Sequence, residues 1–376
     1  MTSIAVLGLA MASCSNEELE NSVFADQNVI GFNVVTNGAQ RATPTTSSNL
    51  TSTDFNVFAF TTTGDYYLGN LATEGVNIAY AGGKWGYTTP SDQRYWPNTP
   101  LNFYAVNPAT SDAHSKGAYM WDFKATTQQI YYTCNPNEFN TGTSTYKNVD
   151  VMYAIAKNQE QSTNDGTVKF QFKHILSQVL FQAKTEREDI DVTIENIDIQ
   201  NVRIGGTFTL PTDADTEATT ADNWVSNFAS HVPYPFFRAV NDANLKVEGK
   251  TEAGEVGKVF KLNHDNPMLV IPQTLTAWDV NTSTTKTKEQ ADNAQQSYLI
   301  ITCKIKQGPA YILGSESAYN TLYIPFGASW EPGKRYIYTI IFGGGYDDQG
   351  NKIMNPIEIE AESAADWVDV NSSIKY

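Results

Sequence analysis

The sequence is poor in cysteine, histidine and basic residues. Its 376 residues include three cysteines and four histidines, and neither type occurs at the spacing of a zinc site. Lysine and arginine number 25 against 41 acidic residues, which gives a net charge of -16. A chain this acidic offers no basic surface that could displace the counterions of a nucleic acid. We therefore expect no metal, no cofactor and no nucleic-acid partner.

Motifs of common enzyme classes are also missing. The sequence contains no GxSxG, no Walker loop, no GxGxxG and no HExxH. Asp213, Asp215 and Glu217 alternate as in a calcium loop, but the central glycine and the closing glutamate are absent, which favours a solvated acidic loop. His174 lies in the amphipathic run "FKHILSQV", where a hydrogen-bonded histidine at the edge of a core is the simpler interpretation. We predict that the chain is not an enzyme.

No apolar run is long enough to cross a bilayer. Ile4–Ala12 holds nine residues, whereas a spanning helix needs about 20. This length suits the apolar region of a secretory signal, and the small residues before Cys14 resemble a bacterial lipoprotein box. We predict that residues 1–13 are a lipoprotein signal peptide and that cleavage leaves Cys14 as a lipid-bearing N-terminus.

Short β-branched and aromatic runs fill the rest of the chain. Glycine, proline, asparagine or aspartate bounds each of them, which is typical of an all-β sandwich. The polar stretch Asn158–Gly166 is the best boundary between two domains, which we place at residues 42–163 and 164–376. Cys303 lies in the apolar run "YLIITCKI" and is expected in a core. Whether Cys303 forms a disulfide with Cys134 stays an open question.

One arginine stands alone near the N-terminus. Arg41 lies in the small polar stretch "NGAQRATPTTSS", and the next basic residue is Lys84. Proteases cut mobile loops of this composition. The preceding run "NVIGFNVV" alternates as a strand does, which places three apolar side chains on one face. These are Ile30, Phe32 and Val34. A solvent-facing arginine without a role is the alternative.

Several strings follow the lipoprotein box in order along the chain. They are "YWP", "LNFYAVNP", "DVMYA", "FKHILSQVLFQA", "MLVIPQTL", "YLIITCKI" and "YIPFGASWEPGKRYIYTIIFGGG". Together with the box they resemble the fimbrillin (Mfa-like) family of Bacteroides-type bacteria, whose members build type V pili. The resemblance runs from about Cys14 to about Trp367, and its most specific parts are Lys173–Lys184 and Trp330–Gly345.

The resemblance implies an all-β chain of two tandem transthyretin-like β-sandwich domains that travels to the outer membrane as a lipoprotein. It also implies that a trypsin-like, arginine-specific protease cuts between Arg41 and Ala42. Residues 14–41 would then be an N-terminal propeptide that carries the first strand. The departure of this strand would leave an apolar groove, and a strand from another pilus subunit would fill it.

The carboxyl terminus offers a candidate donor strand. Its apolar side chains are those of Trp367, Val368, Val370 and Ile374, although "NSS" interrupts the run. The role of a tip or accessory subunit, which accepts a strand without donating one, therefore stays an open alternative.

The alternative function is that of a monomeric surface lipoprotein that keeps its first strand and binds a host ligand or glycan. Four aromatic residues could stack on sugar rings, although packing inside the protein is the simpler interpretation of them. They are Trp85, Tyr87, Tyr95 and Trp96.

Overall fold

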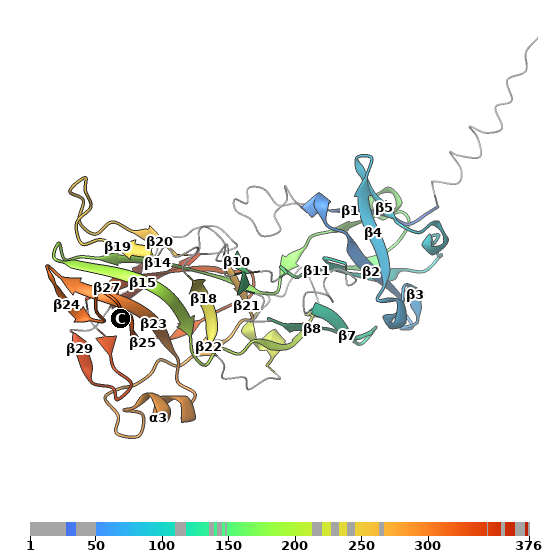
Figure 1. Ribbon diagram of the computed structural model, residues 1–376. Coiled ribbons are helices and arrows are strands. Elements are labelled where there is room, and N and C mark those ends of the chain that lie inside the picture. Colours follow the sequence, from blue (N-terminus) through green and yellow to red (C-terminus); the bar gives the residue numbers. More distant parts are fainter. Residues whose placement is uncertain are drawn as a thin grey trace, which may run out of the picture.

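The fold is all-β, as predicted, and is seen in a computed structural model (Figure 1). The structure describes residues 28–34, 50–109, 118–134, 139–140, 145–146, 149–212, 220–226, 233–238, 245–262, 267–343, 345–354, 358–364 and 373–374. Within these ranges the one α-helix is α3 (Lys288–Asn293), whose first turn is capped by Thr287. Short 3-10 turns occur at Leu50–Ser52, Leu71–Thr73, Pro90–Asp92, Thr163–Gly166 and Ala221–Asn223.

The first sheet has the strand order β12-β1-β5-β4-β2-β6-β11-β13, and β3 pairs with β2 outside this path. Its strands are β1 (Gly31–Val34), β2 (Phe55–Thr61), β3 (Tyr66–Leu68), β4 (Val76–Ala81), β5 (Lys84–Tyr87), β6 (Leu101–Asn107), β11 (Met152–Gln159), β12 (Thr167–Phe170) and β13 (Lys173–His174).

This sheet is buried on both faces in its middle, because successive side chains of a strand point to opposite sides. On β2, Phe55 and Val57 enter one core, whereas Phe58 and Phe60 enter another, as the alternation of this run indicates. The first of these, which we call the small core, also contains Ile30, Phe32, Trp85, Leu101, Phe103, Met152, Val168 and Phe170.

The second, which we call the main core, reaches through the remaining sheets. A four-stranded sheet of order β17-β16-β8-β7 packs on the outer face of β2 and β6, with Phe123 stacked on Phe58 at 4.4 Å between ring centroids. Its strands are β7 (Ala118–Lys124), β8 (Thr127–Thr133), β16 (Gly205–Thr209) and β17 (Trp224–Val225).

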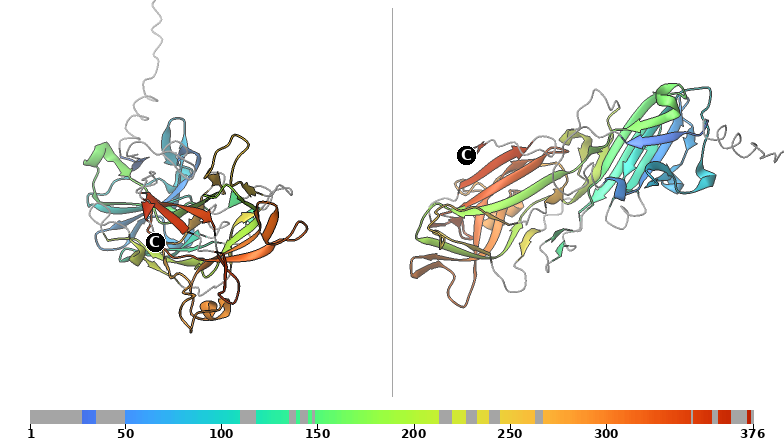
Figure 2. Two further views of the ribbon diagram at one scale, coloured as in Figure 1. Left: turned by 90° about the vertical axis from the view of Figure 1, so that its left-hand side faces the viewer. Right: turned by 90° about the horizontal axis from the view of Figure 1, so that it is seen from above.

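Two larger sheets enclose the main core at the other end of the molecule (Figure 2). One has the order β20-β14-β27-β30-β31, with β21 on β14, and comprises β14 (Ser177–Thr185), β20 (Phe260–Lys261), β21 (Met268–Val270), β27 (Arg335–Phe342), β30 (Glu358–Ala364) and β31 (Ser373–Ile374). The other has the order β18-β15-β23-β25-β28-β29, with β19 on β15 and β24 on β23. It comprises β15 (Ile190–Ile199), β18 (Tyr234–Arg238), β19 (Leu245–Val247), β23 (Tyr298–Gln307), β24 (Ala310–Leu313), β25 (Asn320–Pro325), β28 (Gly345–Tyr346) and β29 (Lys352–Met354). Two small pairs complete the fold, β9 (Phe139–Asn140) with β10 (Thr145–Tyr146) and β22 (Thr274–Leu275) with β26 (Ala328–Ser329).

Both described cysteines are buried free thiols of the main core, which answers the open question of a disulfide between them. The Cys134 thiol donates to the carbonyl oxygen of Leu269 at 3.3 Å. Burial raises the pKa of Cys134 to about 11 and that of Cys303 to about 12. Neither thiol is therefore in the reactive thiolate form at neutral pH.

The polar stretch at 158–166 lies between two strands of the first sheet, because β11 ends at Gln159 and β12 begins at Thr167. The strands β16 and β17 also return to pair with β8, next to the first sheet. The division of the chain at residue 163, and the transthyretin-like character of each part, stay predictions.

Candidate functional site, the slot of the first strand

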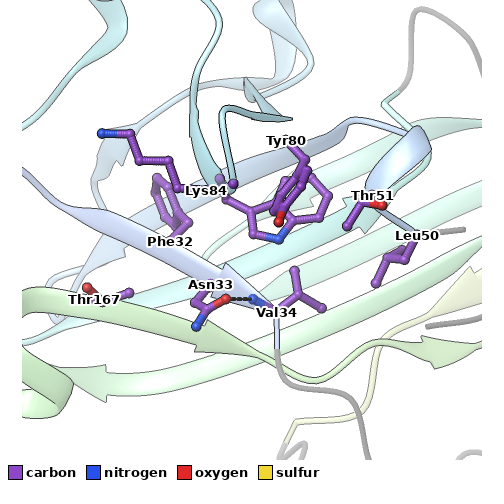
Figure 3. Close-up of a pocket in the computed structure, with 10 residues that line it drawn as sticks. Phe32, Asn33, Val34, Leu50, Thr51, Tyr80, Lys84 and Thr167 are labelled. Atoms are coloured by element: carbon purple, nitrogen blue, oxygen red, sulfur yellow. Dashed lines mark hydrogen bonds between the residues drawn. The ribbon is translucent and has the colours of Figure 1, made fainter. Parts of the chain in front are cut away.

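The first strand lies between two others. β1 pairs in parallel with β12 at four positions, from Gly31 with Thr167 to Val34 with Phe170, and antiparallel with β5 at one position, Phe32 with Trp85. The place between β12 and β5 that β1 occupies is called the β1 slot below. The close-up in Figure 3 shows β1 passing between these two neighbours.

The apolar face of β1 points into the small core, as its alternation predicts. Ile30 is fully buried, Phe32 is 5% exposed and Val34 is half-buried. Three rings surround that of Phe32: Phe170 is stacked at 6.0 Å, and Tyr87 and Phe103 meet it edge to face at 5.5 and 6.3 Å. Burial also raises the pKa of the Tyr87 hydroxyl, although Arg94 nearby opposes this effect.

The first sheet folds over itself at this place. β1 and β6 are separated by three strands in the sheet order, yet Phe32 of β1 packs on Phe103 of β6. Phe55 of β2 likewise meets Phe170 of β12 at 5.9 Å. β1 and β12 therefore form one wall of the small core and β2 and β6 form the opposite wall. Loss of β1 would open that core along the length of the strand.

The chain before β1 is held by main-chain hydrogen bonds. The Ile30 N–H donates to the carbonyl of Arg94 at 2.9 Å, and the Trp96 N–H donates to that of Asn28 at 3.0 Å. Gly31 faces β12 closely, since a β-carbon there would lie 3.1 Å from Thr167 Oγ1. The slot thus fixes β1 by backbone pairing, by close approach and by apolar packing.

A cavity of about 410 Å³ adjoins the C-terminal end of β1. Phe32 and Val34 contribute to its wall from β1, and Tyr80 contributes from the β4–β5 hairpin (Figure 3). Trp85 of the same hairpin also lines it. Lys84 and Thr167 also line it, so that charged and hydroxyl groups meet apolar ones there.

The C-terminal strands lie in another sheet. β30 pairs antiparallel with β27 from Arg335 with Ala364 to Ile341 with Glu358. β31, which contains the predicted donor residue Ile374, pairs with β30 at two positions and forms the edge of that sheet. The other predicted donor residues, Trp367, Val368 and Val370, lie outside the described residues.

The predicted processing sites also lie outside the described ranges. These are Cys14, Arg41 and Ala42. The alternating acidic residues Asp213, Asp215 and Glu217, which are predicted to form a solvated loop, lie outside these ranges too. In the part of the chain that the structure describes, no helix is long and apolar enough to cross a membrane. The described histidine, cysteine and acidic residues form no group of three that could hold a metal ion.

His174 and the aromatic residues have mainly structural contacts. His174 Nδ1 lies 3.0 Å from the carboxylate of Asp150, and both side chains are largely buried, which confirms the interpretation of a hydrogen-bonded histidine at a core edge. Trp85 is buried in the small core, with Tyr87 and Trp96 packed against it. The Trp96 Nε1–H donates to the carbonyl of Gly166 at 2.9 Å, whereas Tyr95 is 57% exposed.

Sequence reasoning did not identify β12 as a wall of the slot. Thr167, Val168 and Phe170 belong to it, and their run "TVKF" alternates as a strand does. The pattern predicts this strand, but not its partner more than 130 positions earlier, because parallel pairing leaves no local turn signal.

A family profile, a curated relative and a solved structure all relate this chain to fimbrial proteins. The profile of the fimbrillin-like family matches residues 41–362. The chain is 27% identical to the fimbrium subunit Fim1C of Phocaeicola vulgatus over 186 residues, which are 46% of this chain and 47% of that protein. The match thus spans about half the length of that relative. The fold is similar to the crystal structure of a fimbrial protein from Bacteroides vulgatus, with a TM-score of 0.56 at 16% identity over 89% of this chain and 99% of that one.

The resemblance that the sequence strings indicate is confirmed by the extent of the profile match. The chain belongs to the fimbrillin-like family.

Proposed function

We propose that the protein is a structural and adhesive subunit of a type V pilus that assembles by strand exchange at the β1 slot. Membership of the fimbrillin-like family supports the pilus role and a place at the cell surface, and this family is one of structural subunits. The observation that carries the strand exchange is the packing of Phe32 on Phe103 and Phe170, since it makes β1 one wall of the small core.

The energetics of the slot favour a replacement strand. Burying an aliphatic or aromatic side chain contributes about 1.5–3 kcal/mol, and β1 with the preceding Ile30 places three such side chains in or against the small core. An emptied slot would also present unpaired main-chain groups of β5 and β12, which add a template for strand addition. While β1 remains in place, it prevents premature assembly.

Two processing steps are proposed, and their support is the sequence around Cys14 and Arg41 together with the family resemblance. Cys14 is proposed to carry the lipid that holds the precursor at the outer membrane. A trypsin-like protease is proposed to cut between Arg41 and Ala42, after which β1 is held by hydrogen bonds and packing alone. The mature subunit would contain two tandem transthyretin-like sandwiches.

The incoming strand is proposed to come from the C-terminal segment of another pilus subunit. In this chain that segment contains Trp367, Val368, Val370 and Ile374. The position of β31 at a sheet edge supports a segment that can leave its own sheet, because it has a hydrogen-bonded neighbour on one side.

Limited trypsin digestion of the chain without residues 1–14 tests the proposal, followed by intact mass and size-exclusion chromatography. We expect cleavage after Arg41 and then oligomers of increasing size. The Arg41→Gln variant should stay intact at this position and monomeric. If interior sites such as Lys84 are cut while Arg41 survives, or if the cleaved protein stays monomeric at high concentration, self-assembly by strand exchange is wrong.

The alternative of a monomeric glycan binder that uses Trp85, Tyr87, Tyr95 and Trp96 has less support. Trp85 is buried, and Tyr87 and Trp96 pack against the small core, so of these four rings only that of Tyr95 is mainly exposed. A single exposed ring does not make a stacking platform.

A further inference from the structure

A second hollow lies on the outward face of the sheet that contains β15, β19, β23 and β24. These strands lie at the opposite end of the molecule from β1 (Figure 1). The volume of the hollow is about 320 Å³. It is lined by Asp191, Val192, Thr193, Lys246, Val247, Glu248, Lys304, Lys306, Tyr311 and Tyr319, and we call it the lysine–tyrosine hollow.

The strand register brings the basic residues of this hollow together. Thr193 pairs with Lys246 on one side and with Lys304 on the other, which gives one row across three strands. Asp191 pairs with Lys306, and Lys306 pairs with Tyr311, which gives the adjacent row. The intervening side chains, such as Val192 and Ile305, are buried in the main core, so the two rows face outward.

Two of the lysines are held in place by neighbouring rings. Lys304 Nζ lies 4.4 Å from the centroid of the Tyr319 ring, and Lys306 Nζ lies 4.7 Å from that of Tyr311. Lys304 Nζ also donates to the carbonyl of Glu316. Such contacts reduce the side-chain entropy that a ligand would otherwise have to remove.

The loop that carries Tyr319 approaches Lys304 closely. Gly314 has a φ of +73°, and a β-carbon there would lie 2.7 Å from the carbonyl oxygen of Ala318 and 3.3 Å from Lys304 Cγ. The Ser315 N–H donates to the same carbonyl at 2.8 Å and closes the turn. Glycine is therefore needed at this position for the loop to fold back toward the lysine row.

The charges of the hollow restrict the ligand. Among the described residues, none of its three ammonium groups lies within 4.0 Å of a carboxylate oxygen, although Asp191 and Glu248 share the same lining. A polyanion such as a nucleic acid would be repelled by these carboxylates and by the net charge of -16. A neutral ligand would leave the ammonium groups without a charged partner.

We propose that the lysine–tyrosine hollow binds a saccharide that carries a carboxylate, such as a sialic or uronic acid residue. The ammonium groups of Lys246, Lys304 and Lys306 would bind the carboxylate by charge-assisted hydrogen bonds. The carboxylates of Asp191 and Glu248, together with the Thr193 hydroxyl, would accept hydrogen bonds from sugar hydroxyl groups. The volume of the hollow lies at the lower end of the range for ordinary ligand pockets, which suits one or two sugar rings.

Calorimetric titration of the full chain with sialyllactose and with trigalacturonate tests the proposal, with lactose as the neutral control. We expect at least one of the two acidic sugars to bind with a Kd of about 1 mM, weaker at high salt, and lactose not to bind. Lys306→Gln and Lys246→Gln should each weaken binding about tenfold, because each removes a hydrogen bond to a charged group. Lys352→Gln, on β29 of the same sheet and outside the hollow, should change binding less than about twofold.

Any one of three results would overturn the proposal. The first is that lactose binds as well as the acidic sugars, and the second is that both lysine variants bind unchanged. The third is that neither acidic sugar saturates up to about 20 mM, which is some twenty times the expected Kd. Triglutamate distinguishes a protein partner, since tighter binding of this peptide than of either sugar would also overturn it. Thr193→Val is a second variant for the case that a lysine variant does not fold. It should weaken sugar binding without a change in the salt dependence.

Discussion

β1 near the start of the chain and β31 near its end are both short strands. β1 lies between two neighbours, whereas β31 pairs with β30 alone among the strands that the structure describes. β1 inserts Phe32 into the small core, and the preceding Ile30 is buried there too, in a segment that is hydrogen-bonded to Arg94 and Trp96. β31 contributes two backbone pairings to β30. Loss of the first strand would therefore open a core, which suits an acceptor slot. Loss of the last strand would remove two backbone pairings, which suits a donor segment.

Removal of the Phe32 side chain should lower the stability of the protein more than any other change proposed below. Phe32→Ala leaves an internal void next to Phe103 and Phe170, so we expect the free energy of unfolding to fall by about 3–5 kcal/mol. Chemical denaturation measures this change. Val225→Ala on β17 serves as the control, because Val225 is 61% exposed and its truncation should change stability by less than about 0.5 kcal/mol. Similar values for both variants would contradict the role of β1 as a core wall.

A β-branched side chain at Gly31 should have a smaller effect. Gly31→Val places atoms against Thr167 Oγ1, which would lie 3.1 Å from the new β-carbon, and forces β1 and β12 apart. We expect a loss of about 1–3 kcal/mol in the free energy of unfolding. Gly86→Val on the neighbouring strand β5 is the matched control, since a β-carbon at that position would have no atom within 4 Å. A larger loss at Gly86 than at Gly31 would show that the slot is not closely fitted.

Removal of residues 365–376 should change the stability least among the three. This truncation removes β31 and its two pairings with β30, and we expect a decrease of less than about 1 kcal/mol in the free energy of unfolding. After cleavage at Arg41, the truncated protein should no longer form homo-oligomers, because the donor strand is missing. A loss of stability as large as that of Phe32→Ala would show that the C-terminal segment is part of the fold and not a donor.

The two buried thiols test whether the effect of losing β1 stays local. Cys134 and Cys303 belong to the main core, so in a Cys14→Ser background a thiol reagent at pH 8 should label neither, before or after removal of β1. Their pKa values of about 11 and 12 lie above the ordinary value of 9.0. The protonated, buried thiols therefore contribute fully to the free energy of unfolding below about pH 9. This contribution is lost as the pH rises through the pKa values of the folded state. Rapid labelling of the cleaved protein at pH 8 would mean that the main core opens together with the small one.

The sequence predicts the faces of strands better than their neighbours. The alternation of Ile30, Phe32 and Val34 predicts the inward face of β1, because side-chain direction has a period of two residues. The pairing of β1 with β12 depends on contacts between distant segments, so no local pattern predicts it. Similarly, the runs "RYIYTIIF" and "PIEIEAE" predict a long hairpin, and β27 and β30 do pair antiparallel. The intervening β28 and β29 instead join another sheet through Tyr323 and Tyr346, where Asp347 closes the turn.

A reversible lock on β1 tests strand exchange most directly. Asn33 and Lys169 are paired positions on β1 and β12 and both side chains are exposed, so cysteines there can form a disulfide. The Asn33→Cys/Lys169→Cys variant, in the Cys14→Ser background, is cleaved after Arg41 and examined by size-exclusion chromatography when oxidised and when reduced. We predict a monomer with the first strand still attached in the oxidised form, and oligomers after reduction. Oligomers in the oxidised form, or monomers in both, would contradict the exchange of β1 for a strand of another subunit.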